Sequence, residues 1–481
     1  MKTPPKKSFF CFRRFAFSFV AFAVTHNLVP AQDHWNLSEE AHRRSRLSGE
    51  AIPLQLETFP SRNGPFIEIG ENFLGPGNLQ GGFQIPGGAV WQPYFIVFGS
   101  LRTAVQSFGR SKAPVQEWSN RLDLFGNLYL TFTERILIGI RPLDEKGMFT
   151  NYTFRGGPKE FKDQLNAEIT TLFFEGDFGE LFPDLDPFDR HGLDFGLSVG
   201  RQFVSFQEGV LINDNIDAAG ITRINMKWFG AINFRWSLMY GWNKINRLSA
   251  SLNVEDKDAQ LVALLTELDT RASTVAFDVI YVDAKNSTGD GIYAGLSSVS
   301  RLGSTNATFR LVGSYPIGTE TDYNRSGALF MTQLGWSPLR THNFLYLNLF
   351  AGLDRYRSAA RDPGVGGPLA PSAGVLFSGA GLGRFGSALT TFADNVVGSS
   401  LGYQLFFASN RQQLVFELGG RYGYKDTGQS AAAVGMRYQV ALGQRFLVQI
   451  DGAGGYVFLV NNVKPADQML YGARFEIAVS L

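Results

Sequence analysis

The 481-residue chain contains one cysteine, Cys11, only five histidines, and acidic and basic residues in nearly equal number, 43 and 44. A single cysteine excludes an intramolecular disulfide framework, and the scattered histidines give no ligand spacing of a zinc site. The balanced charge argues against a nucleic-acid partner. We therefore expect no metal, no other cofactor and no nucleic acid bound to this protein.

Long apolar runs are also missing. No stretch of 18 apolar residues follows position 31, which excludes membrane-spanning α-helices. The metalloprotease motif H-E-x-x-H does not occur. His342 is expected beside a tight turn on the periplasmic side, which is the wrong side for hydrolysis at the cell surface. We therefore predict that the protein is not an enzyme, and keep an outer-membrane hydrolase only as the last alternative.

The first 31 residues are organised like a secretory signal peptide. Five basic residues and no acidic ones lie in this segment, and the short apolar stretch FAFSFVAFAV (15–24) precedes small residues at Val29-Pro30-Ala31. Its removal lowers the number of basic residues from 44 to 39, against 43 acidic ones. We predict an exported chain with a signal peptide (1–31), an N-terminal region (32–93) and one large domain (94–481).

From residue 94 onward the sequence alternates apolar and polar residues in segments of about ten residues, the length of a tilted membrane-spanning strand. The stretches 121–132, 231–240 and 344–354 are examples, and each carries arginine, aspartate or asparagine on its polar face. A soluble sandwich would bury the apolar face, whereas an outer-membrane barrel turns it to lipid and the polar face to a water-filled lumen. Charges in mid-strand and aromatic residues near strand ends favour an all-β, transmembrane antiparallel β-barrel.

The order of short and long connections gives the number of strands. In outer-membrane barrels, short turns face the periplasm and longer loops face outward. Counting back from the C-terminus, tight turns fall near Gly443, Asn410, Pro338, Asp269-Thr270-Arg271, Phe229-Gly230 and Thr133-Glu134. This order requires residues 259–268 to form a strand although their composition favours a helix. It predicts about 18 strands, with 16 as the fallback, and an unusually long periplasmic connection at 176–192.

The last stretch, YGARFEIAVSL (471–481), alternates to its final residue. We predict a terminal strand that pairs with the first strand, because a closed barrel leaves no unpaired edge. The stretch is similar to the C-terminal signal that the barrel-assembly machinery reads, although it ends in Leu481 rather than an aromatic residue. Outer-membrane lipid and this machinery are therefore expected partners.

Two long segments lack the strand pattern. Residues 32–93 include a predicted helix at Ser38–Arg46 and a Gly/Pro-rich stretch, and we favour a periplasmic extension over a plug inside the barrel. For residues 363–398, rich in Gly, Ala and Ser, we favour a surface loop, with a short helix at Ser387–Val397, over a loop that narrows the lumen. The acidic run from Asp184 to Asp189 lacks EF-hand spacing, and we predict no calcium there.

The hairpin around 193–228 contains Gly200-Arg201-Gln202, a loop, and then the basic strand Ile221–Lys227. Together with the segment 259–286, it resembles alginate-export-type outer-membrane barrels over roughly residues 165–300. This resemblance implies a monomeric 18-stranded fold and an arginine-rich pore for an anionic polysaccharide.

Strand parity, extended to the ends of the strands, predicts which charged side chains line the lumen. Arg201 falls on the lipid face by strict parity, and we include it because a bulge at Gly200 would turn it inward. Such charges act either as a selectivity surface or as braces between strands. The basic candidates are Arg102, Arg121, Arg141, Arg201, Arg223, Lys227, Arg235, Arg310, Arg421, Arg437 and Arg474. The acidic candidates are Asp123, Asp194, Asp278, Asp354, Glu417, Asp451 and Glu476.

These features predict a porin-like channel in the bacterial outer membrane for passive passage of hydrophilic, in particular anionic, solutes such as acidic saccharides. The alternative is a plugged or structural barrel whose loops bind a ligand or partner.

Overall fold

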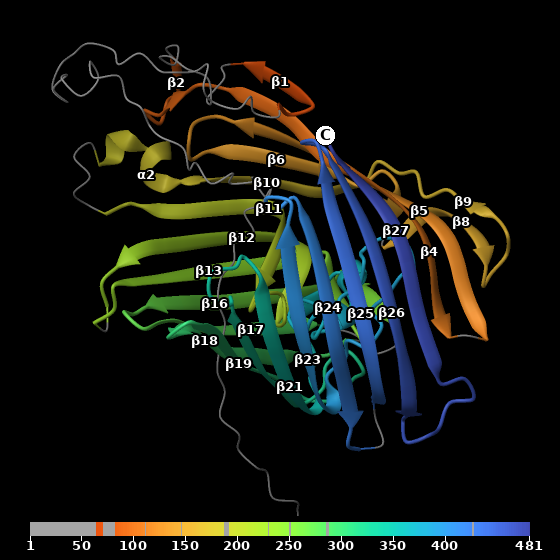
Figure 1. Ribbon diagram of the computed structural model, residues 1–481. Coiled ribbons are helices and arrows are strands. Elements are labelled where there is room, and N and C mark those ends of the chain that lie inside the picture. Colours follow the sequence, from red (N-terminus) through yellow and green to blue (C-terminus); the bar gives the residue numbers. More distant parts are fainter. Residues whose placement is uncertain are drawn as a thin grey trace, which may run out of the picture.

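The computed structural model describes residues 64–70, 82–110, 112–145, 147–186, 192–228, 230–249, 252–284, 288–425 and 428–481. The predicted signal peptide and the helix at Ser38–Arg46 lie outside these residues. Among them, antiparallel strands form a closed barrel (Figure 1). No helix in these ranges has the length and apolar character needed to cross a membrane.

The main sheet has 23 strands, of which 18 form the closed ring, because β1, β7, β8, β9 and β22 attach to it as short additions. The 18 ring strands are β4 (Tyr94–Arg110), β5 (Ala113–Tyr129), β6 (Arg135–Ile140), β10 (Ile169–Asp177), β11 (Phe195–Phe206), β12 (Ile212–Met226), β13 (Asn233–Asn243), β16 (Ala259–Asp269), β17 (Ser273–Ala284), β18 (Gly291–Leu302), β19 (Thr305–Pro316), β20 (Gly327–Trp336), β21 (Phe344–Arg355), β23 (Asp394–Phe407), β24 (Gln412–Gly423), β25 (Gln429–Leu442), β26 (Phe446–Val460) and β27 (Met469–Ser480).

Closure is made by the last strand. Residues Leu470–Ser480 of β27 pair with Ser100–Arg110 of β4, and the Leu481 N–H donates to the carbonyl of Gly99. The predicted count of 18 strands is confirmed. The strand prediction for 259–268 is confirmed by β16, whose apolar inner positions outweigh the helical preference of leucine and alanine because they are buried in the barrel.

Connections of two kinds alternate around the ring. We call the end with mostly tight connections the turn end and the opposite end the loop end. The turn-end connections are 130–134, 178–194, 227–232, 270–272, 303–304, 337–343, 408–411 and 443–445. The predicted long connection is present at 178–194 and includes the one-turn helix α2 (Phe178–Leu181) and the 3-10 turn η2 (Pro183–Leu185).

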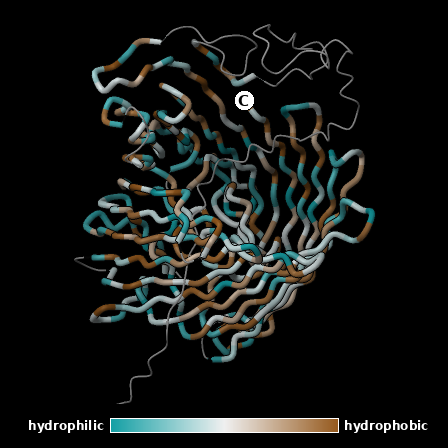
Figure 2. Tube along the Cα trace, turned by 90° about the vertical axis from the view of Figure 1, so that its left-hand side faces the viewer, coloured by the Kyte–Doolittle hydropathy of each residue, from teal (hydrophilic) through white to brown (hydrophobic). Residues whose placement is uncertain are grey.

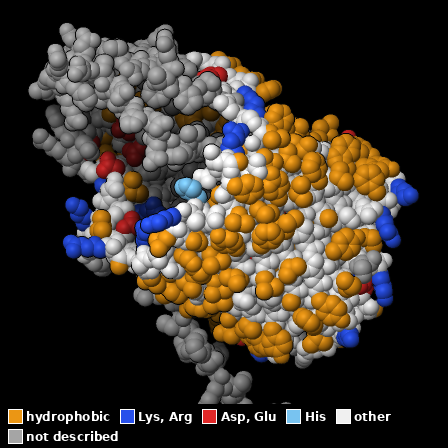
Figure 3. All heavy atoms as spheres, viewed as in Figure 1, with side chains coloured by type: hydrophobic (Ala, Val, Ile, Leu, Met, Phe, Trp, Pro, Cys, Tyr) orange, Lys and Arg blue, Asp and Glu red, His pale blue; other side chains and the backbone are white. Residues whose placement is uncertain are grey.

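The outer face of the ring is apolar. Val105, Trp118, Leu238, Phe330 and Phe475 are all exposed on it. Over β23–β27, hydrophobic side chains spread across the surface, and most Lys and Arg side chains lie along its margins (Figure 3). Apolar and polar residues alternate along the strands (Figure 2). A belt of this kind faces lipid in a membrane barrel.

Three insertions from the loop end fold into the ring. They are the tip of the β11–β12 hairpin (207–211), the hairpin of β14 (Ile245–Leu248) and β15 (Asn253–Asp256), and the segment 356–393, which we call the inner loop. The inner loop contains β22 (Ala360–Arg361), η3 (Pro363–Val365) and η4 (Val375–Phe377), and β22 pairs in parallel with Ile212 and Asn213 of β12.

The position of the inner loop corrects two predictions. Residues 363–398 are not a surface loop, because side chains such as Leu369, Leu376 and Phe377 are buried against the inner wall. The helix predicted at Ser387–Val397 is also wrong, since no helix lies there and β23 begins at Asp394. Small residues permit this placement because they let the loop backbone approach the wall closely.

The insertions divide the lumen into two unlike halves. Inward side chains of β16–β20, among them Leu265, Ile280 and Val312, form one apolar core with the insertions. Burial of each such side chain contributes about 1.5–3 kcal/mol. Near the loop end, Ala431, Ala433 and Val457 of β25 and β26 also join this core. Toward the middle of the strands, the inner faces of β24–β27 and β4–β6 carry mostly polar and charged side chains, so any water-filled path through the ring lies along this second half.

The described N-terminal residues lie at the turn end. β1 (Ile67–Gly70) pairs with Tyr94–Val97 of β4, and Arg445 donates to the carbonyl of Gly64 at 3.1 Å. The hairpin of β2 (Phe83–Gln84) and β3 (Val90–Trp91) lies against the connection 178–194, because a Cβ on Gly88 would stand 2.7 Å from the Asp184 carboxyl carbon. β1 thus extends the main sheet, whereas β2 and β3 form a separate two-stranded sheet.

Candidate functional site: the charged lumen wall

Five arginines stand side by side on the polar half of the inner wall. We call them the arginine row: Arg437 on β25, Arg474 on β27, Arg102 on β4, Arg121 on β5, and Arg141 directly after β6. Three wall carboxylates interleave with them, Asp451, Glu476 and Asp123. Asp362 of the inner loop lies 3.8 Å from Arg141, so the five guanidinium groups exceed these four carboxylates by one positive charge. All eight wall residues were predicted to face the lumen, and the structure brings them together on adjacent strands.

The row is held by short ion pairs. Asp451 accepts from Arg437 at 2.6 Å and from Arg474 at 3.0 Å. Arg102 pairs with Glu476 through two nitrogens, at 2.7 and 3.1 Å. Such bidentate contacts are the strongest that a guanidinium makes with a carboxylate.

On the other side of the row, Asp123 accepts from Arg121 at 2.7 and 2.9 Å and from Arg141 at 3.0 Å. Arg102 and Arg121 are direct cross-strand partners. Like charges in this position destabilise a sheet. Each of the two has its own carboxylate partner, Glu476 for Arg102 and Asp123 for Arg121, which offsets the repulsion between them.

The inner loop occupies part of the hydrogen-bonding capacity of these two arginines. Arg102 donates to the carbonyl of Ala380 at 2.8 Å, and Arg121 donates to the carbonyl of Gly381 at 2.9 Å. Nearby, the loop residue Arg384 pairs with Glu117 of β5 at 2.7 Å. The loop backbone therefore sits where a solute carboxylate would meet the row.

A cavity of about 330 Å³ lies between the inner loop and the wall of β4 and β25–β27. Arg384, Arg437 and Asp451 line it together with loop residues such as Ser387 and Thr390. Arg384 is half-exposed there. The cavity is large enough for a small organic anion, and positive side chains stand on two of its sides.

Two wall residues of β24 also hold the inner loop by its backbone. Glu417 accepts from the N–H groups of Val375 and Leu376 at 2.7 and 2.8 Å. Arg421 donates to the carbonyls of Thr390 and Phe392. Glu417 and Arg421 thus face the lumen as predicted, but they bind the loop. Within the loop, burial lowers the pKa of Arg361 to about 10.

The base of the inner loop is fixed by the buried pair Arg357–Asp394, with nitrogen–oxygen distances of 2.6 and 3.1 Å. Replacement of Arg357 by alanine is expected to cost about 3–5 kcal/mol, because it leaves the Asp394 carboxylate buried without its cation. Thermal unfolding of detergent-solubilised protein, followed by heat-modifiable gel migration, measures this loss. Lys425→Ala, which removes an exposed pair with Asp354, is the matched control; equal melting of the two variants would contradict the assignment.

The remaining inward charges brace the insertions and the wall. Arg310 of β19 is buried and donates to Gln207 at 2.7 Å while pairing with Glu208 at 3.0 Å, so it holds the tip of the β11–β12 hairpin. Arg235 of β13 pairs with Glu267 of β16. Asp278 of β17 is inward and fully buried, and it accepts from the N–H of Thr266.

Two residues predicted in the lumen face outward instead. Arg201 shares its side of the sheet with the exposed Leu172, its cross-strand partner on β10, and pairs with Asp217 at 2.7 Å. Gly200 has a φ of 124°, but the register with β10 and β12 continues unbroken through it. The inward bulge at this position is therefore wrong.

Arg223 is also directed outward, because its cross-strand partner Trp236 alternates with the inward Ser237. The guanidinium carbon lies 4.7 Å from the ring centroid of Phe195, and a nitrogen lies 3.5 Å from Asp194 at the turn-end rim. Lys227 follows the end of β12. Arg223, Lys227 and Arg235, all three predicted to line the lumen, therefore do not come together on its wall.

Asp354 is also absent from the lumen wall, since it lies at the loop-end rim and pairs with Lys425 at 2.8 Å. Several of the charged residues that were wrongly predicted to line the lumen thus lie at the ends of strands.

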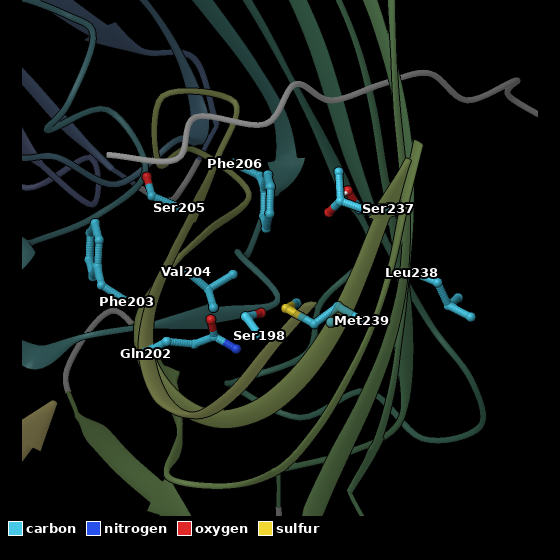
Figure 4. Close-up of a pocket in the computed structure, with 11 residues that line it drawn as sticks. Ser198, Gln202, Phe203, Val204, Ser205, Phe206, Ser237, Leu238 and Met239 are labelled. Carbon is cyan, nitrogen blue, oxygen red and sulfur yellow. Dashed lines mark hydrogen bonds between the residues drawn. The ribbon is translucent and has the colours of Figure 1, made fainter. Parts of the chain in front are cut away.

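A small cavity of about 40 Å³ lies beneath the curled β11–β12 hairpin. Val204, Phe206 and Met239 face it, whereas Phe203 and Leu238 point away (Figure 4). Ser198 on this wall is the centre of Gly196-Leu-Ser-Val-Gly200, which has the G-x-S-x-G spacing of a hydrolase nucleophile, as has Gly398–Gly402. Both stretches lie inside extended strands rather than on the sharp strand-to-helix turn that this motif requires. No group of three metal-ligating side chains occurs in the residues that the structure describes.

Comparison with known proteins gives a fold likeness without close sequence relatives. No family model and no curated protein matches the chain. Among solved structures, Pseudomonas aeruginosa OccK2 (OpdF) aligns with a TM-score of 0.55 and 9% identity over 80% of this chain and 98% of that one. Acinetobacter baumannii OccAB2 aligns with a TM-score of 0.54 and 10% identity over 80% and 98%.

A BenF-like porin from Pseudomonas fluorescens Pf-5 gives a TM-score of 0.53 and 10% identity over 80% and 99% of the two chains. OccK2 has also been solved in complex with glucuronate. These likenesses confirm a porin-like β-barrel fold. The similarity to alginate-export-type barrels is not confirmed and stays a prediction.

Proposed function

We propose that this protein is a non-enzymatic outer-membrane channel for passive passage of small, hydrophilic, anionic solutes such as acidic saccharides. The observation that carries this proposal is the arginine row on the polar half of the lumen, whose five guanidinium groups outnumber the carboxylates paired with them by one. Arginine is always charged and presents a planar fork that matches a carboxylate. A solute anion that passes the row would exchange successive guanidinium contacts instead of losing all hydration at once.

The apolar outer belt supports placement in an outer membrane, with lipid as the partner of the exposed strands. By the usual arrangement of such barrels, the turn end faces the periplasm and the loop end faces outward. A barrel of this kind would be inserted by the barrel-assembly machinery. One of the similar structures is described as a porin, and another, OccK2, has been solved with glucuronate, which is consistent with an anionic solute here.

The inner loop bears on the size of the solute. It reaches from Tyr356 near β21 to Gly381 and Arg384 beside β4 and β5, and its contacts cross the lumen. The cavity of about 330 Å³ that remains beside the loop has room for a monomeric solute and argues against a polysaccharide chain. The same loop favours one alternative, a closed barrel whose cavity binds a ligand without conducting it.

Planar-bilayer recording of the purified, folded protein tests the proposal. Under a KCl gradient we expect discrete conductance steps whose reversal potential favours chloride. The preference should weaken as salt rises, because the Debye length shortens from about 10 Å at 0.1 M to about 3 Å at 1 M. Absence of any current from folded protein would support the closed barrel instead, and cation preference at low salt would contradict the role of the arginine row.

A further inference from the structure

Four glutamines on four adjacent strands form a continuous band on the turn-end side of the arginine row. They are Gln404 on β23, Gln413 on β24, Gln439 on β25 and Gln449 on β26. Gln413 and Gln439 are direct cross-strand partners, as are Gln439 and Gln449. We call this set the amide band.

Hydrogen bonds run through the amide band in one direction. Gln404 donates to Gln413 at 2.6 Å, Gln413 donates to Gln439, and Gln439 donates to Gln449 at 2.5 Å. Gln449 then donates to Asp451 of the charged wall at 2.6 Å. The band is therefore oriented by the same carboxylate that holds Arg437 and Arg474.

The band keeps capacity for a solute. An amide has two N–H donors and two acceptor lone pairs. The chain of bonds uses one donor of each glutamine and one lone pair of each acceptor. Gln404, Gln413 and Gln439 are partly exposed on the inner face. The unused donors and lone pairs alternate along the wall at about the strand spacing of 4.8 Å.

Two aromatic side chains extend the band on β21. Phe344 faces inward opposite Gln404, and Tyr346 faces inward opposite Gly402. Their ring centroids are 6.3 Å apart with planes inclined by 32°. The Tyr346 hydroxyl donates to Glu417, which fixes the ring. An apolar aromatic surface beside alternating donors and acceptors suits a molecule with C–H faces and hydroxyl edges.

We propose that the amide band and the Phe344–Tyr346 pair form a second recognition surface that reads the hydroxyl groups of the solute. This inference rests on the proposed channel function and narrows it to polyhydroxylated carboxylates. The carboxylate contacts the arginine row while the hydroxyls and ring contact the neighbouring surface. If the amide band only held the strands together, the hydroxyl groups of a solute would not change its permeability.

Bi-ionic reversal potentials with glucuronate and cyclohexanecarboxylate test the inference, because the two anions share a six-membered ring and one charge but differ in hydroxyl groups. Wild-type protein is expected to favour glucuronate. The double variant Gln413→Met/Gln439→Met, which keeps side-chain volume and removes two amides, is expected to lower this preference roughly fivefold. Its chloride preference in KCl should be unchanged, since the arginine row is intact.

Gln412→Met is the matched control, because Gln412 adjoins the band on β24 but faces outward, where it accepts from Tyr438. The single variant Gln439→Met keeps the test informative if the double variant folds poorly. An unchanged preference in a folded, conducting variant would overturn the role of the amide band and leave the channel standing. Absence of current in wild-type protein would overturn the channel and this inference together.

Discussion

Deletion of residues 368–390 is expected to raise the single-channel conductance roughly threefold, because an 18-stranded ring without an internal obstruction leaves an open aqueous channel. The deletion is geometrically simple. The Gly367 N–H donates to the Thr391 hydroxyl oxygen at 2.8 Å, so a short Gly-Ser link can join the two ends. The Arg357–Asp394 pair at the base of the loop is retained. Conductance in 1 M KCl, where screening weakens the effect of wall charges, measures the width directly.

Since the deletion also exposes part of the apolar core, a point variant gives an independent test. A Cβ on Gly383 would lie 2.3–2.5 Å from Ser119, Gln106 and Glu117, so Gly383→Val should push the loop from the wall and raise conductance in the same direction. Gly379→Val is the control, because no atom lies within 4 Å of its Cβ position. Unchanged conductance in both the deletion and the Gly383 variant would show that ions do not pass through the region the loop occupies.

Simultaneous replacement of Arg102 and Arg121 by glutamine is expected to lower the chloride-to-potassium permeability ratio roughly tenfold at low salt, as expected for the loss of two charges in a partly desolvated lumen. The substitution leaves three arginines against four carboxylates, Asp362 included, so the excess charge changes from positive to negative. Glu476 and Asp123 also lose close cationic partners, which strengthens the attraction for potassium.

The outward-facing arginines give the controls for this experiment. Arg223→Gln removes a cation from the turn-end rim, and Arg201→Gln removes one from the outer face, each without a change in the lumen wall. Reversal potentials in a KCl gradient should then match wild type. If Arg223→Gln or Arg201→Gln lost as much anion preference as the double variant, selectivity would come from the overall electric field of the protein rather than from the arginine row.

The strands and their order were predictable because each depends on local pattern. Alternating residues such as Leu122, Leu124 and Leu128 require one face in an apolar environment, and the spacing of turns leaves few ways to arrange the hairpins. Residues 259–269 show the same logic, since the alternation of connections outweighs the local helical preference. The arginine row was likewise predictable, because four of its five members lie in mid-strand where parity is unambiguous and Arg141 directly follows β6.

Charges near strand ends were less predictable. In Ile221–Lys227, isoleucines occur at both odd and even positions, so parity does not distinguish the faces. Arg223 stays outside because it stacks on Phe195 and reaches polar groups at the rim, a position where long cationic side chains extend toward water. Strict parity gives the outward direction of Arg201, and only the assumed bulge at Gly200 led to the wrong prediction; the pair with Asp217 on the next strand holds its side chain there.

The position of the inner loop inside the lumen could not be predicted from the sequence, because no residue pattern in the loop indicates it. Its small residues suit a surface loop and a buried one equally well. What places it in the lumen is a set of distant groups, such as Glu117 and Arg121 of β5, which lie more than 250 positions earlier in the chain. Its backbone is satisfied only after the ring supplies these partners.

The divided lumen also has a thermodynamic consequence. The contacts between the inner loop and the apolar half of the wall follow the physics of a globular core, whose strength is largely entropic near room temperature and weakens on cooling. Exposure of this surface to water carries a positive heat capacity. The apolar part of the contact that holds the inner loop is thereby coupled to temperature, in a sense opposite to the usual loosening of loops by heat: cooling weakens it.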